Sequence, residues 1–148
     1  MALFDIFKSK EVREIEKRTK AFSDFLTIQT MTAILFSVSG LSEHQKITTA
    51  IFFDCAVTLL FNDLNDRTLE DKILGEYLIA HPQLGIESEH INKGRWLAQQ
   101  QHDEKAVYVV GQAEKALLGL FSGEDTRTSL QELLSDDMLQ WDDDFPMD

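Results

Sequence analysis

The chain of 148 residues is poor in cysteine and in proline, and each shortage excludes something. It contains one cysteine, Cys55, and two prolines, Pro82 and Pro146. A lone cysteine excludes an internal disulfide, and its place in an apolar stretch predicts that it packs as a small hydrophobic side chain. Residues 1–8 lack the charged region that opens a secretory signal, so we expect a protein of the reducing cytoplasm.

Basic side chains are also scarce. The chain has 14 Lys and Arg against 26 Asp and Glu, a formal net charge of -12. Such a charge repels the phosphate backbone and forgoes the release of counterions, so direct binding of nucleic acid is disfavoured. The same charge attracts basic proteins. Residues 123–148 hold one basic and nine acidic groups, which is two thirds of the net charge.

Long apolar runs are absent. The longest, from Ala50 to Phe61, has twelve residues and includes Asp54, whereas a membrane span needs about 20. We therefore expect no transmembrane segment. The composition is 43% hydrophobic and 27% charged, which is typical of a folded globular chain, and the length suits one compact domain.

Apolar residues recur at spacings of three and four far more often than at two, which predicts an all-α protein. We expect a single-domain bundle of five or six helices over residues 1–135, followed by an acidic, aromatic-containing tail over residues 136–148. The stretch 43–61 is apolar on nearly every side, as in a helix surrounded by others. Ser42 and Gln45 have the spacing of a capping box, which predicts that this central helix begins there.

The remaining helices have weaker boundaries. Residues 62–66 favour a turn, after which Asp66 or Thr68 caps a third helix that Pro82 ends. Thr128 and Gln131 again have capping-box spacing, which predicts a short last helix.

Between these elements, residues 87–121 fit either two helices or one long bent helix. Gly111 and Gly119 lie inside this stretch, where each costs about 1 kcal/mol relative to alanine. Close packing of a neighbouring helix would explain both glycines. Gly123 is typical of a helix C-terminal stop.

The end of the chain mixes large apolar side chains with carboxylates. Trp141, Asp142, Asp143, Asp144 and Phe145 are the candidate partner-binding residues, with the aromatic rings supplying contact area and the aspartates steering a basic partner. With Pro146 this segment resembles the acidic tail by which bacterial single-stranded-DNA-binding proteins recruit other proteins; in that family a phenylalanine ends the chain, whereas Met147 and Asp148 follow here. In the alternative, Trp141 and Phe145 fold back onto the bundle.

Asp54 is the candidate buried polar site. A carboxylate between Phe53 and Cys55 must find a partner or stay protonated if it is buried. It fits either a ligand-binding or proton-transfer group, or a structural ion pair with a facing helix. Glu87 and His90 have the Glu-x-x-His spacing of helical metal sites, although no second such pair occurs.

No motif in the chain defines a reaction, and we expect neither an enzyme nor a bound metal or cofactor. The preferred hypothesis is a non-catalytic interaction or regulatory protein that binds a basic protein partner. One alternative is a helical bundle with a small-molecule or metal site near Asp54, Glu87 and His90. The other is a self-associating structural protein that completes its burial in a homodimer.

Overall fold

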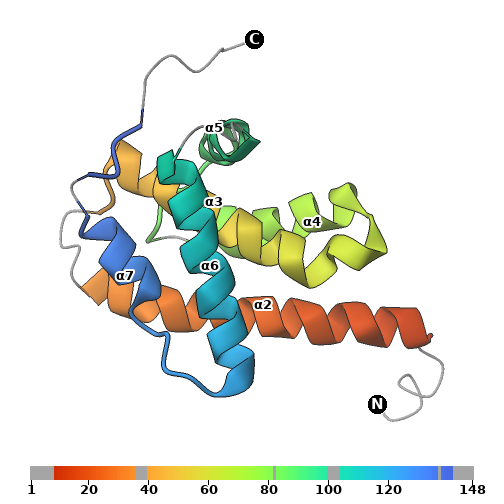
Figure 1. Ribbon diagram of the computed structural model, residues 1–148. Coiled ribbons are helices and arrows are strands. Elements are labelled where there is room, and N and C mark those ends of the chain that lie inside the picture. Colours follow the sequence, from red (N-terminus) through yellow and green to blue (C-terminus); the bar gives the residue numbers. More distant parts are fainter. Residues whose placement is uncertain (1–8, 36–39, 82, 100–103, 137, 142–148) are drawn as a thin grey trace.

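A computed structural model describes residues 9–35, 40–81, 83–99, 104–136 and 138–141 (Figure 1). Within these residues the chain forms six α-helices and no strand, which confirms the predicted all-α bundle. The helices are α2 (Lys10–Leu35), α3 (Glu43–Phe61), α4 (Arg67–Ile73), α5 (Ser88–Gln99), α6 (Glu104–Ser122) and α7 (Ser129–Leu134). A short 3-10 helix, η1 (Asn62–Leu64), follows α3, and a π-helix, η2 (Leu74–Ile79), continues α4.

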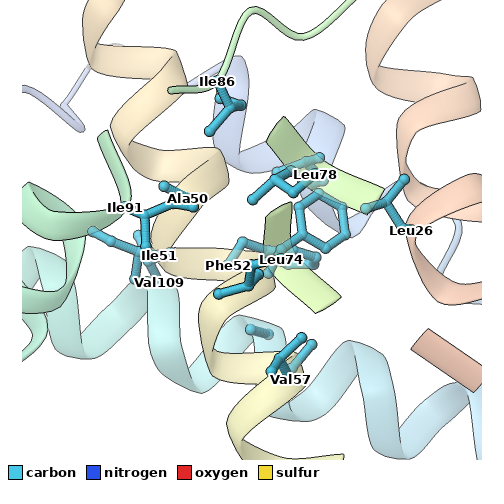
Figure 2. Packing of buried hydrophobic residues seen from close by; sticks show 14 of the residues in the cluster. Leu26, Ala50, Ile51, Phe52, Val57, Leu74, Leu78, Ile86, Ile91 and Val109 are labelled. Carbon is cyan, nitrogen blue, oxygen red and sulfur yellow. The ribbon is translucent and has the colours of Figure 1, made fainter. Parts of the chain in front are cut away.

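The central helix is α3, as predicted. Its capping box is present, because Ser42 Oγ accepts from the Gln45 N–H at 3.2 Å and Gln45 Oε1 accepts from the Ser42 N–H at 2.9 Å. Helices α2, α5, α6 and α7 all pack against α3, and Figure 2 shows its residues Ala50, Ile51 and Phe52 within the apolar cluster that these elements enclose. The core therefore follows α3.

The helical stretch Glu43–Leu64 is, by length and composition, apolar enough to cross a membrane, and it is the one such stretch in the described part of the chain. In the structure 56% of its most apolar window is buried by the rest of the bundle. The core helix of a bundle and a membrane span have the same composition. In the bundle this stretch contains the core helix α3.

Aromatic rings join α2 to α3. The Phe25 and Phe52 rings are stacked with centroids 5.6 Å apart, and Phe53 meets Phe52 edge-on at 5.2 Å. Phe22 contacts Phe53 in the same edge-on manner. Such pairs add about 0.5–1.5 kcal/mol each beyond the area they bury. In the view of Figure 1, α2 runs the length of the bundle, and α6 runs across the direction of α2.

The glycines of the helices have different explanations. A Cβ on Gly119 would lie 2.5 Å from Thr126 Cγ2, and one on Gly94 would lie 3.0 Å from Ile51 Cγ1, so both allow close packing. Gly111 is different, because nothing lies within 4 Å of the position of its Cβ. Close packing within the chain is therefore the wrong explanation for Gly111. Gly123 follows α6 with φ +80°, as expected of a helix stop.

The weaker helix boundaries are partly as predicted. Asp66 caps α4 by accepting from the Leu69 N–H at 3.1 Å. Helices α5 and α6 are separate elements on either side of residues 100–103, which like Pro82 lie outside the described residues. The predicted capping box of α7 is wrong, because the Thr128 side chain makes no cap hydrogen bond.

A side chain from another helix supplies the missing cap. Gln29 of α2 is fully buried, and its Oε1 accepts from the Leu130 N–H in the first turn of α7 at 3.0 Å. Its Nε2 donates to the Thr126 carbonyl at 2.7 Å. Gln29 therefore satisfies two backbone groups at the start of α7, which local spacing cannot reveal.

Candidate functional site

The structure places Trp141 in the core. Its side chain is 3% exposed, and its Nε1–H donates to Thr48 Oγ1 at 3.0 Å. The backbone N–H of Trp141 donates to His44 Nδ1 at 2.9 Å. Because the ring is buried and its only donor is satisfied, Trp141 holds the chain against α3 and presents no surface to a partner. This corrects its assignment as a partner contact and agrees with the fold-back alternative for this residue.

The boundary between bundle and tail moves accordingly. Leu139, which is 6% exposed, joins Trp141 in the hydrophobic core, so residues expected in the tail complete the bundle. The reason is that their apolar area is better buried than exposed, although acidic residues surround them in the sequence. Asp142, Asp143, Asp144 and Phe145 lie outside the described residues, and their partner-binding role stays a prediction.

His44 and Thr48 are residues that the sequence reasoning missed. They lie one turn apart on α3, so their side chains share a face. Since His44 Nδ1 accepts a hydrogen bond from the Trp141 N–H, the neutral ring carries its proton on Nε2. The only signal in the sequence was this spacing of four, which is too common to identify a docking position for Trp141.

Asp54 belongs to an ion-pair network between helices. Its side chain is 14% exposed, and Oδ1 accepts from Arg95 Nε at 3.1 Å and Arg95 Nη2 at 3.0 Å. Arg95 also pairs with Asp71, and Arg67 Nη2 lies 3.7 Å from Asp54 Oδ1. Burial disfavours the charge of Arg95, but Asp54 and Asp71 outweigh it and raise the pKa of the guanidinium. The network is thus a structural connection of α3, α4 and α5.

A second buried carboxylate stands beside this network. Glu70 of α4 is 5% exposed, and its Oε1 accepts from Arg67 Nη1 at 2.8 Å and from Thr58 Oγ1 at 3.2 Å. Glu70 escaped the sequence reasoning because its neighbours Leu69 and Asp71 suggest an ordinary amphipathic helix. Its charge is matched by Arg67, so it is no more available for chemistry than Asp54 is.

The side chains of Glu87 and His90 do not converge on a common point. Glu87 is exposed, whereas His90 is 4% exposed and points the other way, toward α3. His90 Nδ1 accepts from the Glu87 backbone N–H at 2.9 Å, and Nε2 donates to Glu43 Oε2 at 2.7 Å. The bond from His90, with a smaller contribution from Lys46, lowers the pKa of Glu43. The Glu-x-x-His spacing here marks a helix start, since the ring satisfies an N-terminal amide.

Cys55 is half-buried and protonated. Its Sγ donates to the Val110 carbonyl at 3.7 Å. Burial raises the pKa of the thiol to about 12, with further contributions from Glu114 and Asp54. Because the thiolate is the reactive form, Cys55 is inert as a nucleophile at neutral pH. This agrees with its expected role as a small hydrophobic side chain.

Two hollows on the surface of the described residues have the space to be considered as ligand sites. One of about 190 Å³ lies between η2 and α5 and is lined in part by Asp71, Asn92 and Arg95; it is smaller than the roughly 300–1,000 Å³ of most ligand pockets. The other, of about 640 Å³, lies beside the start of α2, with Lys10 and Glu14 among its lining residues. Neither lining includes a histidine or a cysteine, and among the described residues no three metal-ligating side chains lie close enough to share an ion.

The fold and these sites define an all-α bundle whose half-buried charges are matched by ion pairs and whose surplus charge is negative. Comparison with protein-family models, with curated proteins and with solved structures finds no significant match.

Proposed function

We propose that the protein is a non-catalytic interaction or regulatory protein whose acidic C-terminal part, residues 123–148, binds a basic protein. The observation that carries the proposal is the distribution of charge, since this part accounts for -8 of the net charge of -12. Much of the positive charge is engaged within the bundle. Among the ion pairs are Arg18–Asp63, Arg67–Glu70, Arg95–Asp54 and Arg127–Asp125.

The described portion of this acidic part combines charge with apolar area. Glu124 and Glu132 are exposed, and the Met138 side chain is 78% exposed. Carboxylates steer a basic partner during approach, and an exposed methionine adapts its shape to the surface it meets. Trp141 is the last described residue and is held against α3, and Asp142, Asp143, Asp144 and Phe145 follow it in the sequence.

The chemistry of the described side chains supports a non-catalytic role. The Cys55 thiol is protonated, the Asp54 carboxylate is paired with Arg95, and both His90 ring nitrogens are engaged in hydrogen bonds. A small-molecule or metal site near Asp54, Glu87 and His90 has less support, because His90 faces α3 while Glu87 faces solvent.

The test compares two variants of equal net charge. In one, Asp142–Asp144 are all changed to asparagine; in the other, three exposed glutamates elsewhere, Glu11, Glu76 and Glu89, are changed to glutamine. Both carry a net charge of -9 in place of -12. Each is used with the unchanged chain for affinity capture from the native cell, and captured proteins are identified after cross-linking.

We expect the asparagine variant to lose a basic partner that the glutamine variant retains, and we expect moderate salt to weaken the capture. Equal loss in both variants would show that net charge alone matters. Capture that is unaffected by either variant, or by salt, would refute the proposal.

A further inference from the structure

The outward side of α6 is an unusually apolar surface for this acidic protein. We define the α6 outer face by its exposed residues Glu104, Lys105, Val107, Tyr108, Gly111, Glu114, Lys115, Leu118, Phe121 and Ser122. The exposed fractions of Leu118 and Phe121 are 65% and 60%, and those of Val107 and Tyr108 are 53% and 49%. These are four of the nine exposed large hydrophobic side chains in the described part of the chain.

Gly111 lies at the middle of this face, and no contact within the chain explains why this position is a glycine. Nothing lies within 4 Å of the place its Cβ would take, yet glycine in a helix interior costs about 1 kcal/mol relative to alanine. Helices that meet at a glycine approach more closely than elsewhere. The flat position at Gly111 is therefore suited to a side chain from outside the chain.

The charge of α6 favours a second copy of this chain over a basic partner. The helix carries two glutamates and two lysines and is neutral, in a protein of net charge -12. Glu114 and Lys115 have no ion pair with another described residue. Two acidic molecules repel each other least where their facing surfaces are neutral, and salt screens the remainder beyond about 8 Å.

The sequence of the α6 outer face is self-complementary in one arrangement. If two α6 helices lie antiparallel about a two-fold axis between Glu114 and Lys115, Leu118 of each copy faces Gly111 of the other. In the same register Phe121 of each lies beside Val107 of the other. The two Glu114 side chains then lie on one flank of the axis and the two Lys115 side chains on the other, so the four charges around the axis sum to zero.

From this register we infer that the protein forms a two-fold symmetric dimer through the α6 outer face, with Leu118 packed on Gly111 of the second copy. The inference goes beyond the proposed partner, because it concerns a different surface. A helix of 19 residues is about 28 Å long and 10 Å wide, which gives roughly 300 Å² per copy before flanking residues contribute. That is less than the roughly 800 Å² of a standard interface, so dissociation on dilution is expected.

Sedimentation equilibrium tests the inference. The average mass should rise from 16.9 kDa toward twice that value as the concentration increases. Glu114→Lys places four positive charges around the axis and Lys115→Glu places four negative ones, so each should weaken the dimer by at least about threefold. A mixture of the two variants should associate again, because one copy then carries two lysines and the other two glutamates.

The Gly111→Ala variant distinguishes an effect on dimerisation from an effect on the stability of the monomer. The added methyl group meets nothing in its own chain, so the melting temperature of the dilute protein should not fall, while the dimer should weaken. A wild-type mass that stays at 16.9 kDa up to about 0.5 mM would overturn the inference. So would a dimer that survives Glu114→Lys and Gly111→Ala unchanged, or a charge-variant mixture that remains monomeric.

Discussion

Removing the Gln29 amide should destabilise the start of α7 more than any exposed change nearby. In Gln29→Leu the Leu130 N–H and the Thr126 carbonyl both lose their partner. A buried group left without a hydrogen bond costs about 1–3 kcal/mol, and water can reach the Thr126 carbonyl more easily than the fully buried Leu130. We expect a loss of about 2–4 kcal/mol in the free energy of unfolding, out of about 5–15 kcal/mol for a typical domain.

Urea unfolding followed by circular dichroism measures this loss, and an unchanged m-value shows that the two native states expose the same surface. Thr32→Val is the matched control. Its Oγ1 donates to the Arg127 carbonyl at 2.7 Å in the same junction, where solvent has access, so its loss should stay below about 1 kcal/mol.

In the Gln29→Glu variant the free energy of unfolding should depend on pH in a way that tests the two hydrogen bonds. A protonated glutamic acid has one donor and one acceptor and imitates the amide, whereas the carboxylate cannot donate to the Thr126 carbonyl. Burial raises the pKa of such a carboxyl group, so the stability it contributes is present at low pH and is lost as the pH rises. The deficit of this variant relative to the wild type should shrink between pH 7 and pH 4. A constant deficit, or a Gln29→Leu variant within about 0.5 kcal/mol of the wild type, would refute the account.

Three further predictions concern single side chains. Asp54→Ala should cost about 2–3 kcal/mol in urea unfolding because it leaves Arg95 half-buried beside fewer charges, whereas Asp71→Ala, at a carboxylate that is 53% exposed, should cost less than about 1 kcal/mol; equal losses would contradict this. Cys55 should react with a thiol reagent at pH 8 at least about 100-fold more slowly in the native than in the unfolded protein, since its pKa is about 12; comparable rates would show an accessible thiolate. Because the pKa of Glu43 is lowered in the folded state, its contribution to stability is present above the unfolded pKa and is lost as the pH falls through the folded one; Glu43→Gln should therefore flatten the decline in stability below about pH 5, and an identical pH profile would exclude the effect.

The parts of the fold that were predictable are those with local signals. The capping box of Ser42 and Gln45, together with apolar residues on every side, identifies α3 because both patterns lie within one element. The Asp66 cap of α4 is predictable for the same reason. Asp54 stood out because a carboxylate interrupts an apolar run, and its surroundings already suggested an ion pair with a facing helix.

The side chains that escaped prediction pair across long stretches of sequence. Gln29 bonds residues about 100 positions away, and His90 bonds Glu43 from a distance of 47 residues. Neither polar side chain differs locally from one that faces solvent, so spacing carries no information about its partner. Trp141 was misassigned for a related reason, because acidic neighbours in the sequence are typical of an exposed segment, whereas its own ring is buried.

The contact of Trp141 with Thr48 also affects how the chain folds while it is being synthesised. Thr48, which receives the indole N–H, emerges from the ribosome 93 residues before the ring that covers it. At about 5–20 residues per second, the first turns of α3 wait roughly 5–20 s for that cover. During synthesis this patch of α3 is therefore exposed to chaperones, and a chain whose synthesis stalls before Trp141 would leave Thr48 without the indole that covers it.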